Sequence, residues 1–229
     1  LLLDTFFTSD GGFFEPAGFL REAVDAVREA GGLYIADEVQ PGFGRSGRHM
    51  WGFQCHDLIP DIVTMGKPMG NGFPIGAVVG RHAAMERFGT TARYSNTFAG
   101  NTIGIATADA VLTILQRDQI PQNAFAMGLR LRAGLERLAK QRPGIRAIRN
   151  AGLFFGVDMG TESMAPAARR AMAQDVVNAL RDDGVLVSTT GANEDALKVR
   201  PPLICQAEHV DLFLAAVDRA LIRIGTARP

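Results

Sequence analysis

The sequence is poor in aromatic residues, in cysteine and in net charge. Its 229 residues include one Trp, two Tyr and two Cys, and 24 basic residues balance 24 acidic ones. The lack of a basic excess argues against nucleic acid or an anionic membrane as the main partner. No apolar run approaches the roughly 20 residues of a membrane-spanning helix. We therefore expect neither nucleic acid nor a membrane as a partner.

The cysteines and histidines show no spacing typical of a metal site. Cys55 and Cys205 lie far apart, and we interpret them as reduced structural thiols of a cytoplasmic protein. The four histidines form no paired ligand motif, and we interpret them as surface or loop residues: His49, His56, His82 and His209. The sequence therefore predicts no metal.

The first part of the chain alternates apolar strands with a helical pattern. Leu1–Asp4 resembles the middle of a buried strand and no Met precedes it, so we expect the C-terminal part of a longer protein. Helical spacing follows from Pro16 to Ala30, and a second strand covers Leu33–Asp37. This order predicts a parallel sheet, in which ligands gather at the carboxyl ends of the strands. Asp4 and Asp37 both stand at such ends.

The rest of the chain continues this pattern and then changes. Further strands are predicted at 62–65 and 75–79, and helices at 101–115 and 125–140. Beyond them we expect a mixed region, with strands at 145–148, 153–157, 185–187 and 197–199 and helices at 166–182 and 207–224. We place a domain boundary near residue 116, which divides the chain into 1–115 and 116–229.

Two glycine motifs suggest nucleotide binding, but both lack the necessary context. Gly42–Gly47 matches the pattern G-x-G-x-x-G, yet Pro41 intervenes after the strand and no convincing helix follows. Gly66-Lys67 suggests a phosphate loop, but that loop needs a glycine where Asp61 stands and a hydroxyl residue where Pro68 stands. Neither dinucleotide nor nucleoside triphosphate binding is therefore favoured.

Lys67 and Asp37 together suggest a different cofactor. A lysine in a glycine-rich turn is usually solvated, but a confined site that lowers its pKa turns it into a nucleophile that forms imines. An acidic residue at a strand end is often a loop residue, but beside a buried strand it needs a cationic partner. Pyridoxal phosphate would satisfy both residues, because its aldehyde binds an amine and its ring nitrogen pairs with a carboxylate.

Three ordered motifs make the similarity specific: residues 36–47 (ADEVQPGFGRSG), 60–67 (PDIVTMGK) and 94–101 (YSNTFAGN). With these motifs the chain resembles the class III pyridoxal-phosphate aminotransferases over essentially its whole length, as their C-terminal part. The resemblance implies an α/β fold of fold type I. It would consist of part of a large domain with a mostly parallel sheet, followed by an α+β small domain.

The resemblance also assigns roles. It implies that Lys67 binds the cofactor as a Schiff base and shuttles the substrate proton, and that Asp37 keeps the ring nitrogen protonated. Val39 would pack on the ring, and Gln40 would hydrogen-bond its phenolic oxygen. Thr97 would bind the cofactor phosphate of the neighbouring subunit, which implies a homodimer. The alternative for Thr97 is a helix cap before the helix that starts near residue 101.

Some positions depart from the family pattern. Asp4 stands where many members have Glu, so hydrogen bonding near the cofactor would differ, and a further family acid is replaced near Ser9. Lys198 stands where ornithine-type members have a substrate-binding Arg, and Arg200 follows on the same strand face. Either Lys198 or Arg200 could bind a substrate carboxylate or phosphate, and a solvated basic edge is the alternative.

Three functions stay open at this stage. The leading hypothesis is transfer of an amino group from an amine or amino acid to a 2-oxo acid. Because the chain is most similar to the branch of alanine–glyoxylate aminotransferase 2 and the phosphoethanolamine phospho-lyases, elimination of phosphate from an amino-alcohol phosphate is the alternative. The third is a non-catalytic binding domain with the same fold, and the presence of Lys67 argues against it.

Overall fold

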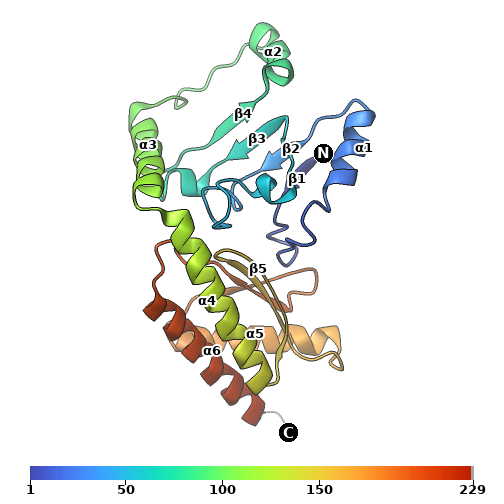
Figure 1. Ribbon diagram of the computed structural model, residues 1–229, viewed down its shortest axis with the longest axis vertical. Coiled ribbons are helices and arrows are strands. Elements are labelled where there is room, and N and C mark those ends of the chain that lie inside the picture. The colour runs from blue at the N-terminus through green and yellow to red at the C-terminus, as the bar shows by residue number, and fades with distance from the viewer. Residues whose placement is uncertain (228–229) are drawn as a thin grey trace.

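The computed structural model describes residues 1–227, which form two four-stranded sheets joined by helices (Figure 1). The strands of the first sheet follow the sequence order: β1 (Leu2–Asp4), β2 (Ile35–Asp37), β3 (Ile62–Met65) and β4 (Ala77–Gly80). The strands β1, β2 and β3 run parallel, and β4 is antiparallel to β3. The register aligns Asp4 with Asp37 and Asp37 with Thr64, so the carboxyl ends of the parallel strands share one edge.

The crossover helix α1 (Arg21–Glu29) connects β1 with β2. Val24 on this helix is fully buried and packs in a cluster with Leu20, Tyr34, Ala36 and Leu58. The predicted start near Pro16 is wrong, since the helix begins five residues later. Gly18 adopts φ 79°, a left-handed conformation that is incompatible with an α-helix. The predicted end is confirmed, because Gly31 adopts φ 77° directly after the helix.

One helix of the first half was not predicted at all. This helix, α2 (His82–Thr91), has no buried residue, and its last residues, Gly89, Thr90 and Thr91, favour helices only weakly. Two short 3-10 helices, η1 (Gly52–His56) and η2 (Lys67–Met69), lie in the region predicted as loop. The exposed segment 92–101 then leads from α2 to α3 (Thr102–Arg117).

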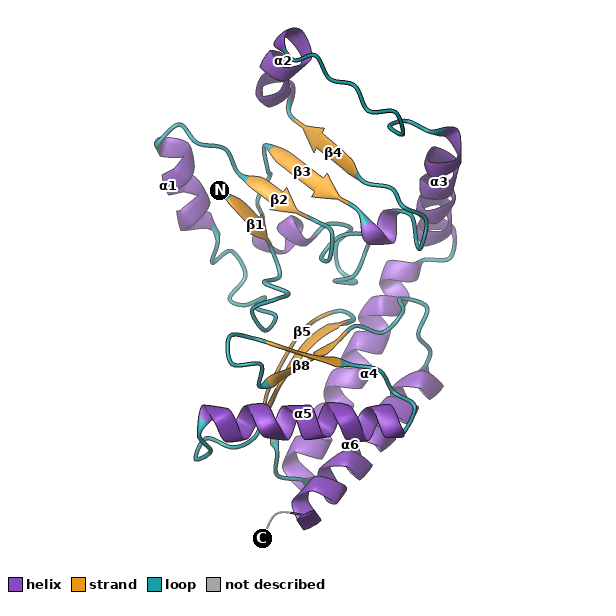
Figure 2. Ribbon diagram, turned by 180° about the vertical axis from the view of Figure 1, so that it is seen from behind, coloured by secondary structure: helices purple, strands orange, loops and turns teal. Residues whose placement is uncertain are grey.

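The second sheet is antiparallel throughout, with the strand order β5 (Ile145–Ala151), β6 (Phe154–Met159), β8 (Ala196–Val199) and β7 (Ser188–Thr190). Three helices pack against this sheet: α4 (Ile120–Gln141), α5 (Pro166–Asp182) and α6 (Ala207–Ala227). Figure 2 shows α5 and α6 below the sheet. All six residues of β6 are buried, so this strand is the centre of the larger core.

The strand predicted at 185–187 is wrong by three residues, because β7 covers 188–190. The chain leaves α5 through Gly184, at φ 82°, and the Val185 amide donates to the Leu180 carbonyl oxygen. Residues 185–187 therefore close the helix end before they reach the sheet, and Leu186 is 83% exposed. An apolar triplet was mistaken for a strand because its length and composition do not distinguish the two.

Two residues separate the end of α3 at Arg117 from the start of the long helix α4 at Ile120, and α4 carries the chain from the first sheet to the second (Figure 1). In the same figure the loop after β1 extends toward the second sheet. Within residues 1–227, no helix combines the length and the apolar character that crossing a membrane requires. In that part of the chain, no three His, Cys, Asp or Glu side chains gather as metal ligands.

Candidate active site

Lys67 lies at the carboxyl end of β3, directly after the extended Gly66 and at the start of η2. Its φ of 35° is in the left-handed region that residues with a side chain rarely adopt. Such strain is maintained only where the surroundings fix it, and it is common at functional sites. Lys67 also lines a cavity of about 350 Å³, whose other walls are Val39, Gln40, Gly42, Arg45, Pro68, Asn71, Gly72, Arg200 and Leu203.

Asp37 ends β2 and is half-buried at the same sheet edge. Its Oδ1 accepts a hydrogen bond of 3.0 Å from the Val39 amide. Among residues 1–227, no basic side chain forms an ion pair with Asp37. A half-buried carboxylate without a cationic partner fits a protonated pyridine nitrogen, because the two charges would neutralise each other.

Val39 connects these two residues in space. Its side chain lines the cavity, and its Cγ2 lies 3.7 Å from the position that a Cβ on Gly66 would take. The apolar surface of Val39 therefore lies beside the backbone that presents Lys67. This position suits a residue that packs on a flat aromatic ring.

Gln40 is held by hydrogen bonds at both ends of its amide. Its Nε2 donates to Thr8 Oγ1 at 2.5 Å, and its Oε1 accepts from Arg200 Nη1 at 2.8 Å. Thr8 Oγ1 in turn donates to the Asp4 carboxylate. A chain of contacts thus runs from Asp4 through Thr8 and Gln40 to Arg200 in the cavity wall.

Thr8 is a residue that sequence reasoning missed. The amides of Phe6 and Thr8 each donate to the Asp4 carboxylate at 3.0 Å, so Asp4 organises the turn that presents the Thr8 hydroxyl. The sequence signal that could have revealed Thr8 is its position four residues after Asp4, because Asp side chains commonly accept hydrogen bonds from backbone amides just downstream. The structure therefore gives Asp4 a local supporting role beside the cavity.

Of the two predicted substrate-binding residues, Arg200 lines the cavity and Lys198 does not. Lys198 Nζ lies 5.8 Å from the centroid of the Phe154 ring. Burial lowers the pKa of the Lys198 ammonium, and the nearby charge of Arg200 lowers it further. The charge of Lys67 also lowers the pKa of Lys198, so Lys67, Lys198 and Arg200 lie close enough to affect one another electrostatically.

Arg45 is a further cation in the cavity wall, within a motif to which the sequence assigned no separate role. Its Nη1 donates to the carbonyl oxygens of Leu153 at 3.1 Å and Pro201 at 2.6 Å. Burial, with a smaller contribution from the charge of Arg200, lowers the pKa of Arg45 to about 10. The cavity wall thus includes Arg45, Lys67 and Arg200 without a lining acid, and this charge favours an anionic ligand.

Glu38 follows Asp37 but points into the protein, where it is fully buried. Its carboxyl oxygens accept hydrogen bonds from the amides of Gly52 at 2.6 Å and Phe53 at 2.8 Å. Burial raises the pKa of Glu38 to about 7 despite these donors. Glu38 therefore anchors η1 against β2, and the two adjacent acids have separate tasks.

The prediction that all four histidines lie on the surface or in loops is wrong for His56. This residue belongs to η1, is fully buried, and its Nε2 lies 3.1 Å from the Thr5 carbonyl oxygen. Burial lowers the pKa of His56, which keeps the ring neutral. Both cysteines are free thiols: Cys55 is half-buried and Cys205 is buried in the larger core.

Thr97 does not take part in this arrangement within one chain. It lies in the exposed segment between α2 and α3 and is not among the residues that line the Lys67 cavity. The cap of α3 is Asn101, whose Oδ1 accepts from the Gly104 amide at 2.7 Å. Thr97 therefore does not cap this helix.

Comparison with known proteins gives consistent matches across the chain. The model of the family described as "Aminotransferase class-III" matches residues 2–221. An alanine–glyoxylate aminotransferase 2-like protein from Drosophila melanogaster is 38% identical over 95% of this chain and 44% of its own length. The mitochondrial alanine–glyoxylate aminotransferase 2 homolog 2 from Arabidopsis thaliana is 36% identical, over 93% of this chain and 45% of its own.

A solved structure shows similarity at the level of the fold and the sequence together. The phospholyase from Arthrobacter, in complex with phosphoethanolamine, matches with a TM-score of 0.90 and 40% identity. This match covers 96% of the present chain and 52% of the Arthrobacter chain. The chain therefore spans about half the length of the proteins it matches.

Proposed function

This chain belongs to the class III aminotransferase family, and on that premise we propose that it moves an amino group from an amine or amino acid to a 2-oxo acid. The observation that carries the proposal is Lys67, held in a left-handed conformation in a cavity wall near Asp37 at the carboxyl edge of the sheet. The rest of the cavity provides the charge that such substrates require.

Membership of the family confirms several expectations from the sequence. The expected family, the enzyme class and the α/β fold of fold type I are confirmed by the family match and by the solved structures. Pyridoxal phosphate is the cofactor of this family, which confirms the cofactor expected from Lys67 and Asp37. The division of the chain at residue 116 and the roles of single residues stay predictions.

The residues of this chain fit that cofactor. When bound, it supplies an aldehyde that reacts with amines and a ring that accepts electrons. Lys67 Nζ would hold the cofactor and later move a proton at the substrate carbon that carries the amine. Asp37 would keep the proton on the ring nitrogen, and Val39 would cover one face of the ring. Gln40 would position a hydrogen-bond donor at the phenolic oxygen.

The cationic wall would bind the acidic group of the substrate. Arg200 presents a guanidinium to the cavity, and Arg45 adds positive charge nearby. Arginine binds carboxylate or phosphate through two parallel hydrogen bonds, whereas lysine acts as a point charge. We therefore assign the main contact to Arg200 and a longer-range attraction to Lys198.

The test of this function is the bond between Lys67 and the cofactor. In the full-length protein, borohydride reduction should attach the cofactor covalently to the peptide that contains Lys67, as read by mass spectrometry. Lys67→Ala should abolish this adduct and reduce turnover by about 10³-fold or more. Lys140→Ala, on the exposed end of α4, is the matched control and should behave like the wild type. An unchanged adduct in Lys67→Ala would contradict the proposal.

A second function, elimination of phosphate from an amino-alcohol phosphate, is also supported by a specific observation. The similar Arthrobacter phospholyase has phosphoethanolamine bound, and the cavity of this chain combines Arg45, Lys67 and Arg200 without a lining acid. Such a wall would accept a phosphate dianion as well as a carboxylate. Incubation with phosphoethanolamine distinguishes the reactions: release of phosphate and ammonia without a 2-oxo acid indicates elimination. Amino transfer that requires a 2-oxo acid indicates the transaminase.

We further propose a homodimer in which Thr97 binds the cofactor phosphate of the partner subunit. Thr97 lies on an exposed segment next to Phe98, which is 80% exposed, and the following helix also exposes Ile103. Apolar side chains exposed together often mark an interface between proteins. The cytoplasmic location expected from the cysteines stays a prediction, and fractionation of cells that produce the full-length protein would test it.

A further inference from the structure

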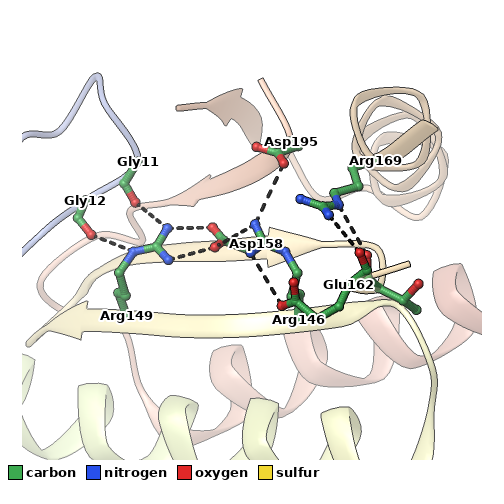
Figure 3. A network of polar contacts seen from close by, with 9 residues as sticks. Gly11, Gly12, Arg146, Arg149, Asp158, Glu162, Arg169 and Asp195 are labelled. Atoms are coloured by element: carbon green, nitrogen blue, oxygen red, sulfur yellow. Dashed lines mark hydrogen bonds and ion pairs between the residues drawn. The ribbon is translucent and has the colours of Figure 1, made fainter. Parts of the chain in front are cut away.

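Arg149 on β5 connects the second sheet with the loop that follows β1 (Figure 3). Its guanidinium donates two hydrogen bonds to Asp158 on β6, from Nη1 at 2.8 Å and from Nη2 at 2.5 Å. The same group donates from Nε to the Gly12 carbonyl oxygen at 2.9 Å and from Nη2 to the Gly11 carbonyl oxygen at 3.1 Å. One side chain therefore fixes two consecutive carbonyl groups of a loop that belongs to the other half of the molecule.

The acid that orients Arg149 is itself well supported. The side chain of Asp158 is only 10% exposed, and Arg146 Nη2 contacts it at 3.1 Å. Arg146 also lies within ion-pair distance of Asp195 and Glu162, at 3.8 Å and 3.7 Å (Figure 3). A planar guanidinium in a bidentate pair has little freedom to rotate, so Arg149 presents its remaining donors in a fixed direction.

The second sheet holds the same loop at another point. Thr190 Oγ1, at the end of β7, lies 3.2 Å from the Thr8 carbonyl oxygen and 3.1 Å from that of Ser9. A Cβ added to Gly156 on β6 would overlap the Gly11 carbonyl oxygen, so the backbones approach closely here. The loop 8–12 is thus fixed by contacts from three strands of the second sheet.

This loop carries the side chain that supports the cavity wall. Thr8 Oγ1 accepts from Gln40 Nε2, and Gln40 Oε1 accepts from the Arg200 guanidinium that lines the cavity. A shift of the loop would move the Thr8 hydroxyl away from Gln40 and would release Arg200 from its amide partner. Lys67 and Asp37 lie on other elements, and within residues 1–227 neither side chain forms a hydrogen bond or ion pair with the loop.

We propose that Arg149 is a positioning residue for the substrate-binding side of the cavity. It holds the loop 8–12 through the carbonyl groups of Gly11 and Gly12, and the loop fixes Arg200 through Thr8 and Gln40. The proposal rests on the function proposed above, in which Arg200 binds the acidic group of the substrate. Loss of Arg149 should therefore weaken substrate binding while Lys67 still holds the cofactor.

The test compares Arg149→Met and Arg149→Lys with the matched control Arg130→Met in the full-length holoenzyme. Arg130 likewise pairs with a single aspartate, Asp211, through three hydrogen bonds, but this exposed pair joins α4 to α6 and does not contact the loop. Arg149→Met should raise KM for the anionic substrate about tenfold, the effect of one weakened hydrogen bond to a charged group, with kcat within about twofold. Arg149→Lys should have a smaller effect, and Arg130→Met none.

The stability of the loop 8–12 can also be measured directly, without substrate. Amide hydrogen exchange at residues 8–12 should become faster in Arg149→Met and stay unchanged in Arg130→Met. Unchanged exchange in the loop, or unchanged KM with faster exchange, would overturn the proposal. If the wild type forms no lysine-bound cofactor, the proposed function fails, whereas the exchange data still decide whether Arg149 holds the loop. If Arg149→Met does not fold, Arg149→Lys carries both measurements.

Discussion

Lys67 combines a strained backbone with the side chain that is proposed to hold the cofactor. A left-handed residue other than glycine costs about 1–3 kcal/mol, and the turn after Lys67 closes tightly, since a Cβ on Gly70 would overlap the Phe73 carbonyl oxygen. The sequence predicted the importance of this lysine from its glycine-rich surroundings. It did not predict the conformation, because φ at one residue depends on how β3, η2 and the following turn pack together.

Glu38 shows how adjacent residues acquire different tasks. The sequence presents Asp37 and Glu38 as one acidic pair, yet Asp37 ends β2 half-buried, and the residue after it, Glu38, is fully buried. Asp37 faces the sheet edge and lacks a cationic partner within the described residues, whereas Glu38 is buried and bonds to the amides of Gly52 and Phe53. Burial is a tertiary property, so the raised pKa of Glu38 could not be predicted from the sequence.

Glu38 should make stability depend on pH. Its pKa rises from 4.5 to about 7 on folding, so the folded state binds more protons than the unfolded state between these values. The contribution of Glu38 to the free energy of unfolding is therefore largest below about pH 4.5 and falls as pH rises to about 7. The change is about 3 kcal/mol, and urea unfolding at a series of pH values measures it.

Glu38→Gln isolates this effect, because the amide does not titrate. The difference in unfolding free energy between wild type and variant should favour the wild type most at about pH 5 and shrink toward about pH 8. Other titrating groups, including His56, are present in both proteins and cancel in the difference. A difference that is constant over this range would contradict the assignment.

At the scale of elements, prediction succeeded where the local sequence determines the element. Helix α5 covers the predicted residues Pro166–Asp182, because an N-terminal proline and an apolar stripe mark it clearly. Helix α1 was predicted too long at its N-terminal end, because the left-handed conformation of Gly18 prevents the helix from starting at Pro16. Helix α2 was missed, and none of its residues is buried.

Packing between elements predicts a contrast between two helical glycines. A Cβ on Gly128 of α4 would overlap the Gly152 carbonyl oxygen, so Gly128→Ala should destabilise the protein by about 1–3 kcal/mol. A Cβ on Gly89 of α2 meets no atom within 4 Å. Gly89→Ala should therefore stabilise that helix by up to about 1 kcal/mol, because alanine favours helices.

Urea unfolding of the two variants beside the wild type measures this contrast. Equal effects of Gly128→Ala and Gly89→Ala would contradict the close contact between α4 and the turn at Gly152. The contact joins residues 128 and 152, which lie on α4 and between β5 and β6, so only the packed structure shows why the first glycine is required.

At the scale of the whole molecule, the proposed dimer allows a complementation experiment. Lys67→Ala and Thr97→Ala should each be nearly inactive as homodimers if Lys67 of one subunit works with Thr97 of its partner. Random mixing of the two variants should restore about a quarter of wild-type activity, since half of the dimers are mixed and each has one intact site. Co-expression with different affinity tags provides the mixed dimers.

The control for this experiment mixes two variants that alter residues contributed to the site by the same subunit. Mixing Lys67→Ala with Asp37→Ala should restore nothing, because both residues lie at the same edge of one chain. Restored activity in that control, or none with Thr97→Ala, would contradict a site shared between subunits. Sedimentation of the wild type gives the oligomeric state independently.

The sequence by itself determined the strand ends that carry Asp37 and Lys67, because apolar runs closed by polar or glycine-rich turns are local patterns. Only the tertiary structure decided which distant residues meet there. Gln40 and Arg200 are 160 positions apart and share a hydrogen bond, and Arg149 reaches loop carbonyls more than a hundred positions away. Such contacts depend on how two sheets pack, and spacing along a chain does not encode that packing.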